Sequence, residues 1–568
     1  MLGHKHMTYR NNISIFWVAI ALYSTVSYSQ VVPDAGIIQR EIESARPQSL
    51  TPEPSRELPA DAGTDDPTSP HFRISGFDIQ GATLIDRTEL LGLIQAAIGQ
   101  SLSAKQLQAL GQRLSDHYRE QGWLVRIYFP QQDFASGSIH IQIIESRYAG
   151  SELESSESRA DFALVKNLAL GQFNIGDPFK IDAIESGILK TNDLPGIKTT
   201  AVLIPGEQTG DTKLRLKITD LPLVSGNLNY ANQGLRATGS NQYQGNFYLN
   251  DPLGRGDQLS VQALGSENMV SVRGQYGWLM GDFGTRLSLF GSHLSYQLGG
   301  NFASLDAEGE GRMLGGVFSQ TFIRQADQNL YASITLENRL NQSSQLGVLN
   351  RLRDINTLTM GLNGDKTDRW ISTARNSTGL QVTLGHLNLD LATEKASDQQ
   401  TARYEGDFVK FNFNLARTEY LNHDWQVSVA FNGQWSAKNL DSSQKFSLGG
   451  PNGVRAYPVN EGMGDSGWML NIELQRQLGY GFQGVLFSDT GAVEVNKQLW
   501  ASSGSTSNQY LLSGVGIGLR WNHQQDWQAS AMVGLPVTSN PARDIYNHNS
   551  DGTRAADPTG WLSLTRFF

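Results

Sequence analysis

Apolar and polar residues alternate with a period of two through most of the chain after residue 221. Val409, Phe411 and Phe413, for example, alternate with Lys410 and Asn412. Such alternation predicts β-strands with one apolar and one polar face. The segments run to about ten residues and several begin or end in Trp, Tyr or Phe, whereas strands of soluble sandwiches are commonly about five or six residues long. We therefore predict a transmembrane β-barrel with an apolar outer face and a wet lumen.

The barrel is expected to have sixteen strands, an even number as in single-chain bacterial barrels. They are predicted at residues 222–232, 242–250, 257–265, 268–280, 283–297, 310–321, 328–343, 355–366, 374–388, 403–418, 424–437, 466–478, 481–490, 508–523, 526–536 and 559–568. The long gaps at 298–309, 389–402, 438–465, 491–507 and 537–558 are expected to be external loops.

Two compact modules are predicted before the barrel, at residues 71–146 and 147–220. In the first, a strand at 72–79 precedes a helix capped by Asp86, a second helix capped by Ser103, and strands at 123–129 and 138–144. The second repeats this pattern with elements at 162–168, 181–189, 199–204 and 212–218. Such modules suggest a binding arm whose strand edges accept another chain, although two structural spacers would give the same pattern.

The first 29 residues have the pattern of a signal peptide. Lys5 and Arg10 precede an apolar run at 13–26, and the small residues Ser27 and Ser29 lie just before Gln30. The alternative is a single N-terminal anchor, for which the run is short. Export through the inner membrane follows, with a mature chain that begins near Gln30.

A short helix is predicted within residues 30–47, because Ile38 and Ile42 are four residues apart on one face. A helix of this length is unstable alone in water and needs a surface on which to dock. Residues 48–70 are rich in Pro, Ser, Thr and acidic residues, which is typical of an extended linker.

Residues 447–458, with the sequence SLGGPNGVRAYP, contain too much glycine and proline for a helix or a ladder strand. Arg455 is therefore expected on a long, tightly turned loop between the eleventh and twelfth strands. From this segment alone, an ordinary solvated surface turn is an equally good interpretation.

Composition excludes several kinds of chemistry. The chain has no cysteine, which leaves neither disulfides nor thiolate metal sites, and its ten histidines form no His-Glu-x-x-His pattern. A net charge of −10 argues against nucleic acid as a partner. The Gly-Asp-Ser-Gly sequence at 464–467 lacks a further glycine at Trp468, and the Arg-Gly-Asp at 255–257 falls in a predicted hairpin turn. We expect no catalytic residue, metal or cofactor.

The whole arrangement resembles the outer-membrane transporters of bacterial two-partner secretion (TpsB proteins; the haemolysin activator/secretion protein family). These belong to a superfamily that also contains the outer-membrane assembly machinery. The resemblance extends over essentially the entire mature chain. Its most specific matches are Val454-Arg455-Ala456-Tyr457, similar to the family's Val-Arg-Gly-Tyr or Phe, and Phe487, Asp489 and Gly491, which are similar to its Phe-x-Asp-x-Gly. Ala456 departs from the glycine of that motif.

The resemblance implies a plug helix carrying Ile38 and Ile42, two POTRA domains at 71–146 and 147–220, and a barrel at 221–568. If the loop enters the lumen, its buried guanidinium needs a partner, and the expected one is Asp489, with Phe487 on the same strand face. Arg455→Ala or Asp489→Ala would then abolish export while the barrel still assembles.

The function implied is secretion of an unfolded partner across the outer membrane, with the POTRA domains in the periplasm. The partner would be a large exoprotein (a TpsA-like adhesin, cytolysin or haem/iron carrier), and the barrel would contact outer-membrane lipid. No phosphate-binding Gly-x-x-x-x-Gly-Lys pattern is present, so nucleotide hydrolysis is not expected to drive export. Two alternatives remain: a barrel-assembly insertase, which more modules and no plug helix would favour, and a diffusion porin or receptor, which leaves the two modules unexplained.

Overall fold

The computed structural model describes residues 32–44, 71–132, 136–154, 158–281, 284–501, 508–524, 526–544 and 546–568. The expected signal peptide at 1–29 and linker at 48–70 lie outside these residues. Within the described ranges, no helix is long and apolar enough to span a bilayer.

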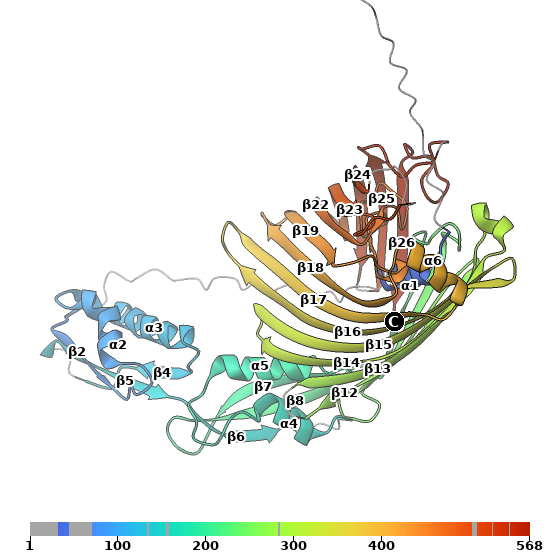
Figure 1. Cartoon of the computed structure of the whole chain (residues 1–568). Helices are drawn as coiled ribbons and strands as arrows, with labels where there is room; N and C mark the ends of the chain where they lie inside the picture. The colour runs from blue at the N-terminus through green and yellow to red at the C-terminus, as the bar shows by residue number, and fades with distance from the viewer. Residues whose placement is uncertain are drawn as a thin grey trace, which may run out of the picture.

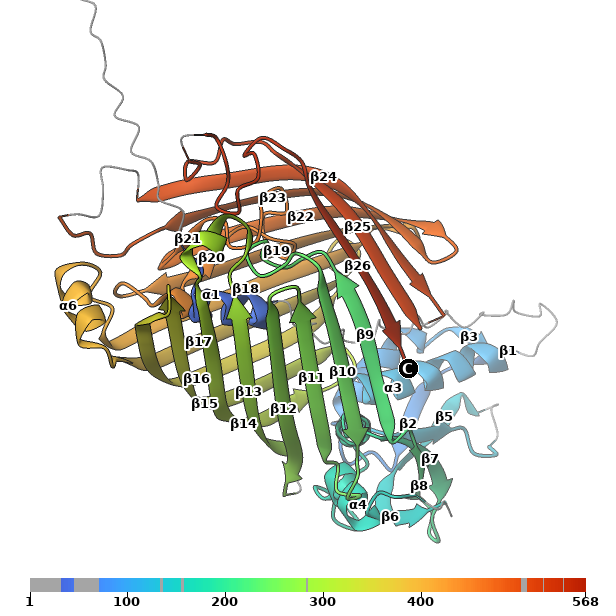
Figure 2. The same ribbon diagram turned by 90° about the vertical axis from the view of Figure 1, so that its right-hand side faces the viewer.

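Sixteen antiparallel strands form a closed barrel in which the last strand pairs with the first (Figures 1 and 2). The strands are β9 (Val224–Ala231), β10 (Gln242–Asn250), β11 (Gln258–Ser266), β12 (Met269–Met280), β13 (Thr285–Gln297), β14 (Glu308–Arg324), β15 (Gln328–Gln345), β16 (Val348–Asp368), β17 (Thr373–Leu389), β18 (Gly406–Tyr420), β19 (Trp425–Ser436), β22 (Ser466–Gly479), β23 (Phe482–Glu494), β24 (Gln509–His523), β25 (Trp527–Pro536) and β26 (Thr559–Phe567). Each corresponds in order to a predicted strand, so the predicted fold class is confirmed.

The main error in the predicted boundaries concerns β16, which begins at Val348 rather than at residue 355. The outward residues Asp354 and Asn356 interrupt the apolar alternation there. This part of the strand lies beside the external loops, where an outward side chain no longer has to be apolar. Hydrophobic alternation therefore marks the lipid-facing part of a strand and not its full length.

The two faces of the barrel wall have opposite character. Outward leucines such as Leu314 and Leu336 are 69% and 61% exposed, whereas the inward Arg339 and Asn341 are 4% and 3% exposed. This inversion of the usual burial pattern is what a barrel surrounded by lipid requires.

The first α+β module has the predicted order of a strand, two helices and two strands. Its sheet order is β2-β5-β4, with β5 parallel to β2 and antiparallel to β4. Asp86 and Ser103 cap the two helices as predicted, Ser103 through a capping box with Gln106. The predicted strand at 72–79 is in fact two strands. The elements are β1 (His71–Arg73), β2 (Gly76–Gln80), α2 (Arg87–Ile94), η1 (Gln95–Ala97), β3 (Ser101–Ser103), α3 (Ala104–Glu120), β4 (Val125–Tyr128) and β5 (Ser138–Glu145).

The second module repeats the first, with sheet order β6-β8-β7 and the same parallel and antiparallel pairings. Its elements are β6 (Arg147–Leu153), α4 (Phe162–Leu170), α5 (Ile181–Asn192), β7 (Ile197–Pro205) and β8 (Asp211–Asp220). Strand β6 was not located from the sequence, because it has no clear apolar alternation. The side chain of Arg324, at the end of β14, donates two 2.8 Å hydrogen bonds to Asp193 after α5, which ties this module to the barrel.

The barrel lumen is occupied. Helix α1 (Ala35–Ser44) lies inside the barrel in both views of the molecule (Figures 1 and 2). The segment between β19 and β22 also turns inward and carries η4 (Ser442–Gln444), β20 (Phe446–Ser447) and β21 (Met463–Gly464). Two other external connections contain η3 (Gly300–Leu305) and α6 (Ala392–Gln400).

Candidate functional site

The loop at 448–462 is a tight structure whose tip lies against the inner wall. Strands β20 and β21 pair at its base, and the amide of Val454 donates a 2.7 Å hydrogen bond to the carbonyl of Leu448. Leu448, Val454, Ala456 and Tyr457 are all buried with Met469, Val493 and Leu512 of the wall. The loop is therefore packed as core and is not the solvated turn that its sequence also allowed.

The structure brings Arg455 and Asp489 into a bidentate ion pair. Nε and Nη2 of Arg455 donate to Oδ2 and Oδ1 of Asp489 at 2.8 and 2.7 Å, and the Arg455 amide donates to Oδ2 at 3.1 Å. The Asp489 side chain has no exposure and that of Arg455 is 5% exposed. Three hydrogen bonds to one carboxylate fix both the side chain and the backbone of the loop tip.

A second carboxylate, Glu473 on β22, completes the charge balance. It pairs with Nη1 of Arg455 and accepts hydrogen bonds from both terminal nitrogens of Arg520 at 2.9 and 3.0 Å. Two arginines thus face two carboxylates in a buried cluster, which leaves no net charge without a partner. Glu473 and Arg520 were not predicted from the sequence, although each is an inward charged residue on one of the two strands that flank β23.

Phe487 and Gly491 shape the wall around Asp489 on the same inward face of β23. The guanidinium carbon of Arg455 lies 3.7 Å from the centre of the Phe487 ring, a close cation–π contact. A Cβ at Gly491 would lie 2.6 Å from a methyl group of Leu448, so glycine leaves room for the loop. Burial alone would lower the pKa of Arg455, but Asp489 and Glu473 raise it above its usual value.

The tip is also bound to the final strands of the barrel. The carbonyls of Arg455 and Ala456 accept hydrogen bonds from Trp561 Nε1 at 2.8 Å and Thr559 Oγ1 at 2.9 Å, both on β26. Tyr457 donates to the carbonyl of Thr538 at 2.5 Å. The loop therefore connects strands β22 and β23 with the strand that closes the barrel.

Helix α1 packs its apolar face on an apolar patch of the inner wall. Ile38 and Ile42 lie with Leu264, Leu294 and Tyr296 in one buried cluster. This patch interrupts the polar lining of the lumen and gives the short helix the docking surface that it needs.

The beginning of α1 is held by a buried cluster of charges. Asp34 bonds with Arg351, Arg353 and Ser442, the last donating to its two oxygens at 2.8 and 2.9 Å. Arg353 also pairs with Glu394 of α6 at 2.7 Å and with Asp441 at 2.6 Å. One arginine on β16 thus joins the helix in the lumen to an external helix and to the base of the loop.

The remaining charged residues of α1 are also engaged. Arg40 donates to the carbonyl of Lys445 at 2.7 Å and to Asn460 at 2.6 Å, and Glu43 pairs with Arg339 at 2.7 Å. Glu41 accepts hydrogen bonds from the amide of Leu235 at 3.0 Å and the side chain of Gln242 at 2.9 Å. Burial raises the pKa of Glu41 to about 7, which is within the physiological range.

The two elements leave a polar cavity of about 440 Å³ between them and the wall, lined by Arg40, Glu43, Glu337 and Arg339 among others. Among the described residues, no group of three or more His, Asp or Glu side chains is placed to hold a metal ion. The geometry is that of a barrel whose lumen holds a docked helix and an inward loop fixed to the wall.

Comparison with protein families decides the assignment. A model described as "Haemolysin secretion/activation protein ShlB/FhaC/HecB" matches residues 210–521, and a model of the ShlB-type POTRA domain matches residues 72–146. The chain belongs to the haemolysin secretion/activation family. It is therefore a secretion transporter of the outer membrane that carries partner proteins, large secreted exoproteins, through its barrel. Its POTRA domains are periplasmic.

Curated relatives support this assignment over nearly the whole chain. The heme/hemopexin transporter protein HuxB of Haemophilus influenzae strain 86-028NP is 26% identical, covering 94% of this chain and 97% of its own. The hemolysin transporter protein ShlB of Serratia marcescens is 24% identical over 78% of each chain.

Two solved structures share the fold of this transporter. CdiB from Escherichia coli matches with a TM-score of 0.65 and 21% identity, covering 93% of this chain and 95% of that one. BamA from Haemophilus ducreyi lacking POTRA domains 1–3 matches with a TM-score of 0.53 and 12% identity, covering 88% and 100%. The second likeness concerns the barrel-assembly alternative but shows the fold alone.

Proposed function

We propose that this transporter exports an unfolded exoprotein through its lumen after α1 leaves the pore. The observation that carries the proposal is that α1 lies in the lumen while being no part of the barrel wall. It is held by an apolar patch, ion pairs and side-chain hydrogen bonds, and no strand has to unpair for it to leave. A sixteen-stranded barrel is wide enough for an aqueous channel once such an element is gone.

The periplasmic modules supply edges for recognition of the partner. Strands β2 and β4 in the first module and β6 and β7 in the second are edge strands of their sheets. Val202 and Leu203 on β7 are about half exposed, so an extended partner has both free backbone groups and apolar side chains to contact. Two modules and a helix in the lumen favour secretion over the insertase alternative.

Cargo of the heme/hemopexin kind is one candidate for the partner, because HuxB matches over most of both chains. Hemolysin-like cargo is the other, from the name of the Serratia relative. Either would be a large exoprotein encoded for export with this transporter.

A disulfide lock tests the central step. The amide of Ala35 lies 3.4 Å from Ser343 Oγ, so the two residues are in contact, and a double variant, Ala35→Cys with Ser343→Cys, is designed to link them by a disulfide in a chain that has no other cysteine. The oxidised variant should assemble but secrete no partner exoprotein, and a reductant should restore secretion. Each single-cysteine variant is the control.

Secretion by a fully cross-linked population would refute the proposal. In the same assay, Arg455→Ala and Asp489→Ala are expected to abolish secretion without loss of the folded barrel, since either change leaves a buried charge without its partner. Full secretion by either variant would remove the loop from the mechanism.

A further inference from the structure

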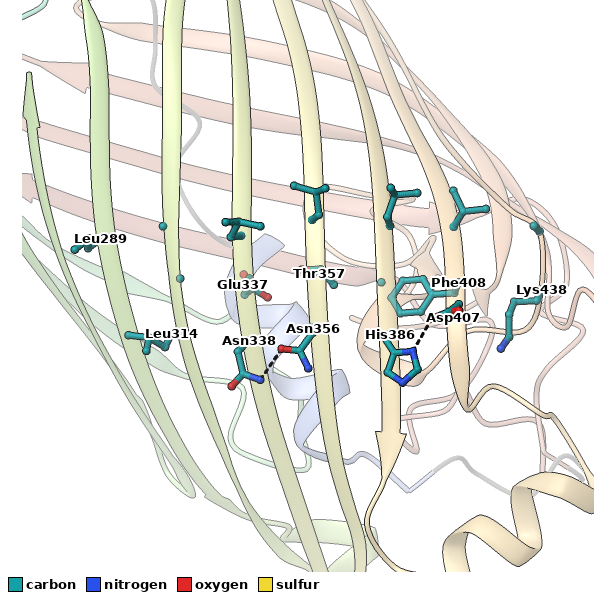
Figure 3. A pocket seen from close by; sticks show the side chains of 18 residues that line it. Leu289, Leu314, Glu337, Asn338, Asn356, Thr357, His386, Asp407, Phe408 and Lys438 are labelled. Atoms are coloured by element: carbon teal, nitrogen blue, oxygen red, sulfur yellow. Dashed lines mark hydrogen bonds and ion pairs between the residues drawn. The ribbon is translucent and has the colours of Figure 1, made fainter. Parts of the chain in front are cut away.

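The outer wall of the barrel has a hollow of about 1100 Å³ that the secretion mechanism does not use (Figure 3). It extends from Leu289 on β13 to Lys438 beyond β19. This volume matches or exceeds that of typical small-molecule sites, which are about 300–1,000 Å³. The hollow lies on the outward face of the barrel, which in the outer membrane contacts lipid.

Strand register divides the hollow into an apolar and a polar row. Outward residues Leu336, Leu358, Leu384 and Val409 are paired successively across β15 to β18. One pleat further along each strand, the paired outward residues are Asn338, Asn356, His386 and Asp407. The wall thus changes from apolar to polar within two residues, or about 7 Å.

The polar row belongs to the outer leaflet. It lies on the side of the hollow that leads to α6 and the external loops, away from the POTRA domains (Figures 1 and 3). The rows therefore match an amphiphile whose acyl chains point to the membrane centre and whose headgroup lies at the external surface.

The hollow has a structural cause. Gly316 faces outward beside Leu336, and a Cβ at this position would lie 3.2 Å from a methyl group of Leu289. Because Gly316 has no side chain, a depression remains in the outer surface between Leu289, Leu314 and Leu336. A flat leucine surface offers lipid chains no preferred position, whereas this recess gives one chain a place to lie against the wall.

The polar row carries one carboxylate and several hydrogen-bonding groups, and the ammonium group of Lys438 lies beside it. Asn338 donates to Asn356 at 3.0 Å, and His386 bonds with Asp407 at 2.5 Å. Nearby, Lys438 donates to the carbonyl of Glu405 at 2.8 Å. A purely anionic headgroup would meet the Asp407 carboxylate, whereas a sugar phosphate offers hydroxyl and amide groups to the amides and carboxylate and a phosphate to Lys438.

We propose that this hollow is a binding site for an acylated sugar phosphate of the outer leaflet, with its acyl chains over Gly316 and the leucine row and its headgroup on the Asn356–His386 row. The inference does not depend on how the partner is translocated. It requires only that the barrel lies in the outer membrane.

The test is native mass spectrometry of the full chain in detergent, titrated with lipid A or with phosphatidylethanolamine. Wild type should bind lipid A at least tenfold more tightly. Gly316→Leu should lose that binding about tenfold by filling the recess, and the displaced Leu289 methyl group is free to move. Gly274→Leu is the matched control, because Gly274 also faces outward, on β12, and has open space around its Cβ position.

Asn356→Ala with His386→Ala changes exposed groups only and should reduce the preference for lipid A while acyl binding persists. Equal affinity of wild type for both lipids would overturn the headgroup assignment. Equal loss in Gly316→Leu and Gly274→Leu, or no loss in Gly316→Leu, would show ordinary surrounding lipid and overturn the site.

Discussion

The departure of Ala456 from the family glycine leads to a sharp prediction about the lumen loop. Ala456 packs directly on Gly514 of β24, where an added Cβ would lie 2.3 Å from the Ala456 Cβ. Carbon atoms in contact need about 3.5–4.0 Å, so Gly514→Ala would force a movement of more than about 1 Å. The loop has little freedom to move, because Asp489, Trp561 and Thr559 hold its tip.

Overpacking of this kind in a filled interior costs about 1–3 kcal/mol. Gly514→Ala should therefore shift the balance between docked and released loop by about 5-fold to 150-fold. Hydrogen exchange of peptides that cover residues 448–462 should become faster by a similar factor, and secretion should fall. Ala456→Gly recreates the family motif and should restore both when it is combined with Gly514→Ala.

Gly534→Ala on β25 is the matched control. A Cβ there would lie 2.7 Å from the Arg455 carbonyl oxygen and 2.8 Å from the Ala456 Cα, both backbone atoms. Ala456→Gly removes neither atom and should not rescue this variant. Unchanged hydrogen exchange in Gly514→Ala, or equal rescue of both glycine variants by Ala456→Gly, would refute a specific contact between Ala456 and Gly514.

Two further predictions concern the helix in the lumen. Arg353→Ala leaves Asp34, Glu394 and Asp441 without their shared partner and should weaken the closed state by about 3–5 kcal/mol. Arg351→Ala removes a partly exposed arginine and should weaken the closed state by about 1 kcal/mol or less. Planar-bilayer recordings should show frequent openings in the first variant and few in the second. Equal behaviour of the two variants would contradict a role of the Arg353 ion pairs in holding the helix. Glu41 has a pKa of about 7 in the docked helix, against a usual value of 4.5. Between these two values the docked helix binds more protons than the released helix. Docking should therefore weaken as the pH rises through this range, by at most tenfold per pH unit. The closed fraction recorded from pH 5 to pH 8 should fall in wild type and stay level in Glu41→Gln; a level wild-type response would exclude Glu41 as the titrating group.

Much of the architecture was determined by the sequence alone, because the apolar residues of each strand show which of its faces contacts lipid. Alternation with a period of two can be recognised within one strand, without its neighbours, and all sixteen strands were therefore predicted in the correct order. The helix caps at Asp86 and Ser103 could also be predicted from the sequence, because a capping side chain bonds to a backbone amide within three residues of it. The pairing of Arg455 with Asp489 came from resemblance to family motifs.

Only the tertiary structure decided which inward side chains come into contact with one another. Alternation assigns a side chain to the inner face but does not say which inner residues lie opposite one another, and these contacts join distant parts of the chain. Glu473 and Arg520, the Trp561 bond to the loop, and the close fit of Ala456 on Gly514 all arise in this way. The apolar patch under Ile38 and Ile42 and the ion pairs of Arg353 also depend on the curvature that brings β11, β13 and β16 around one short helix, which no local pattern encodes.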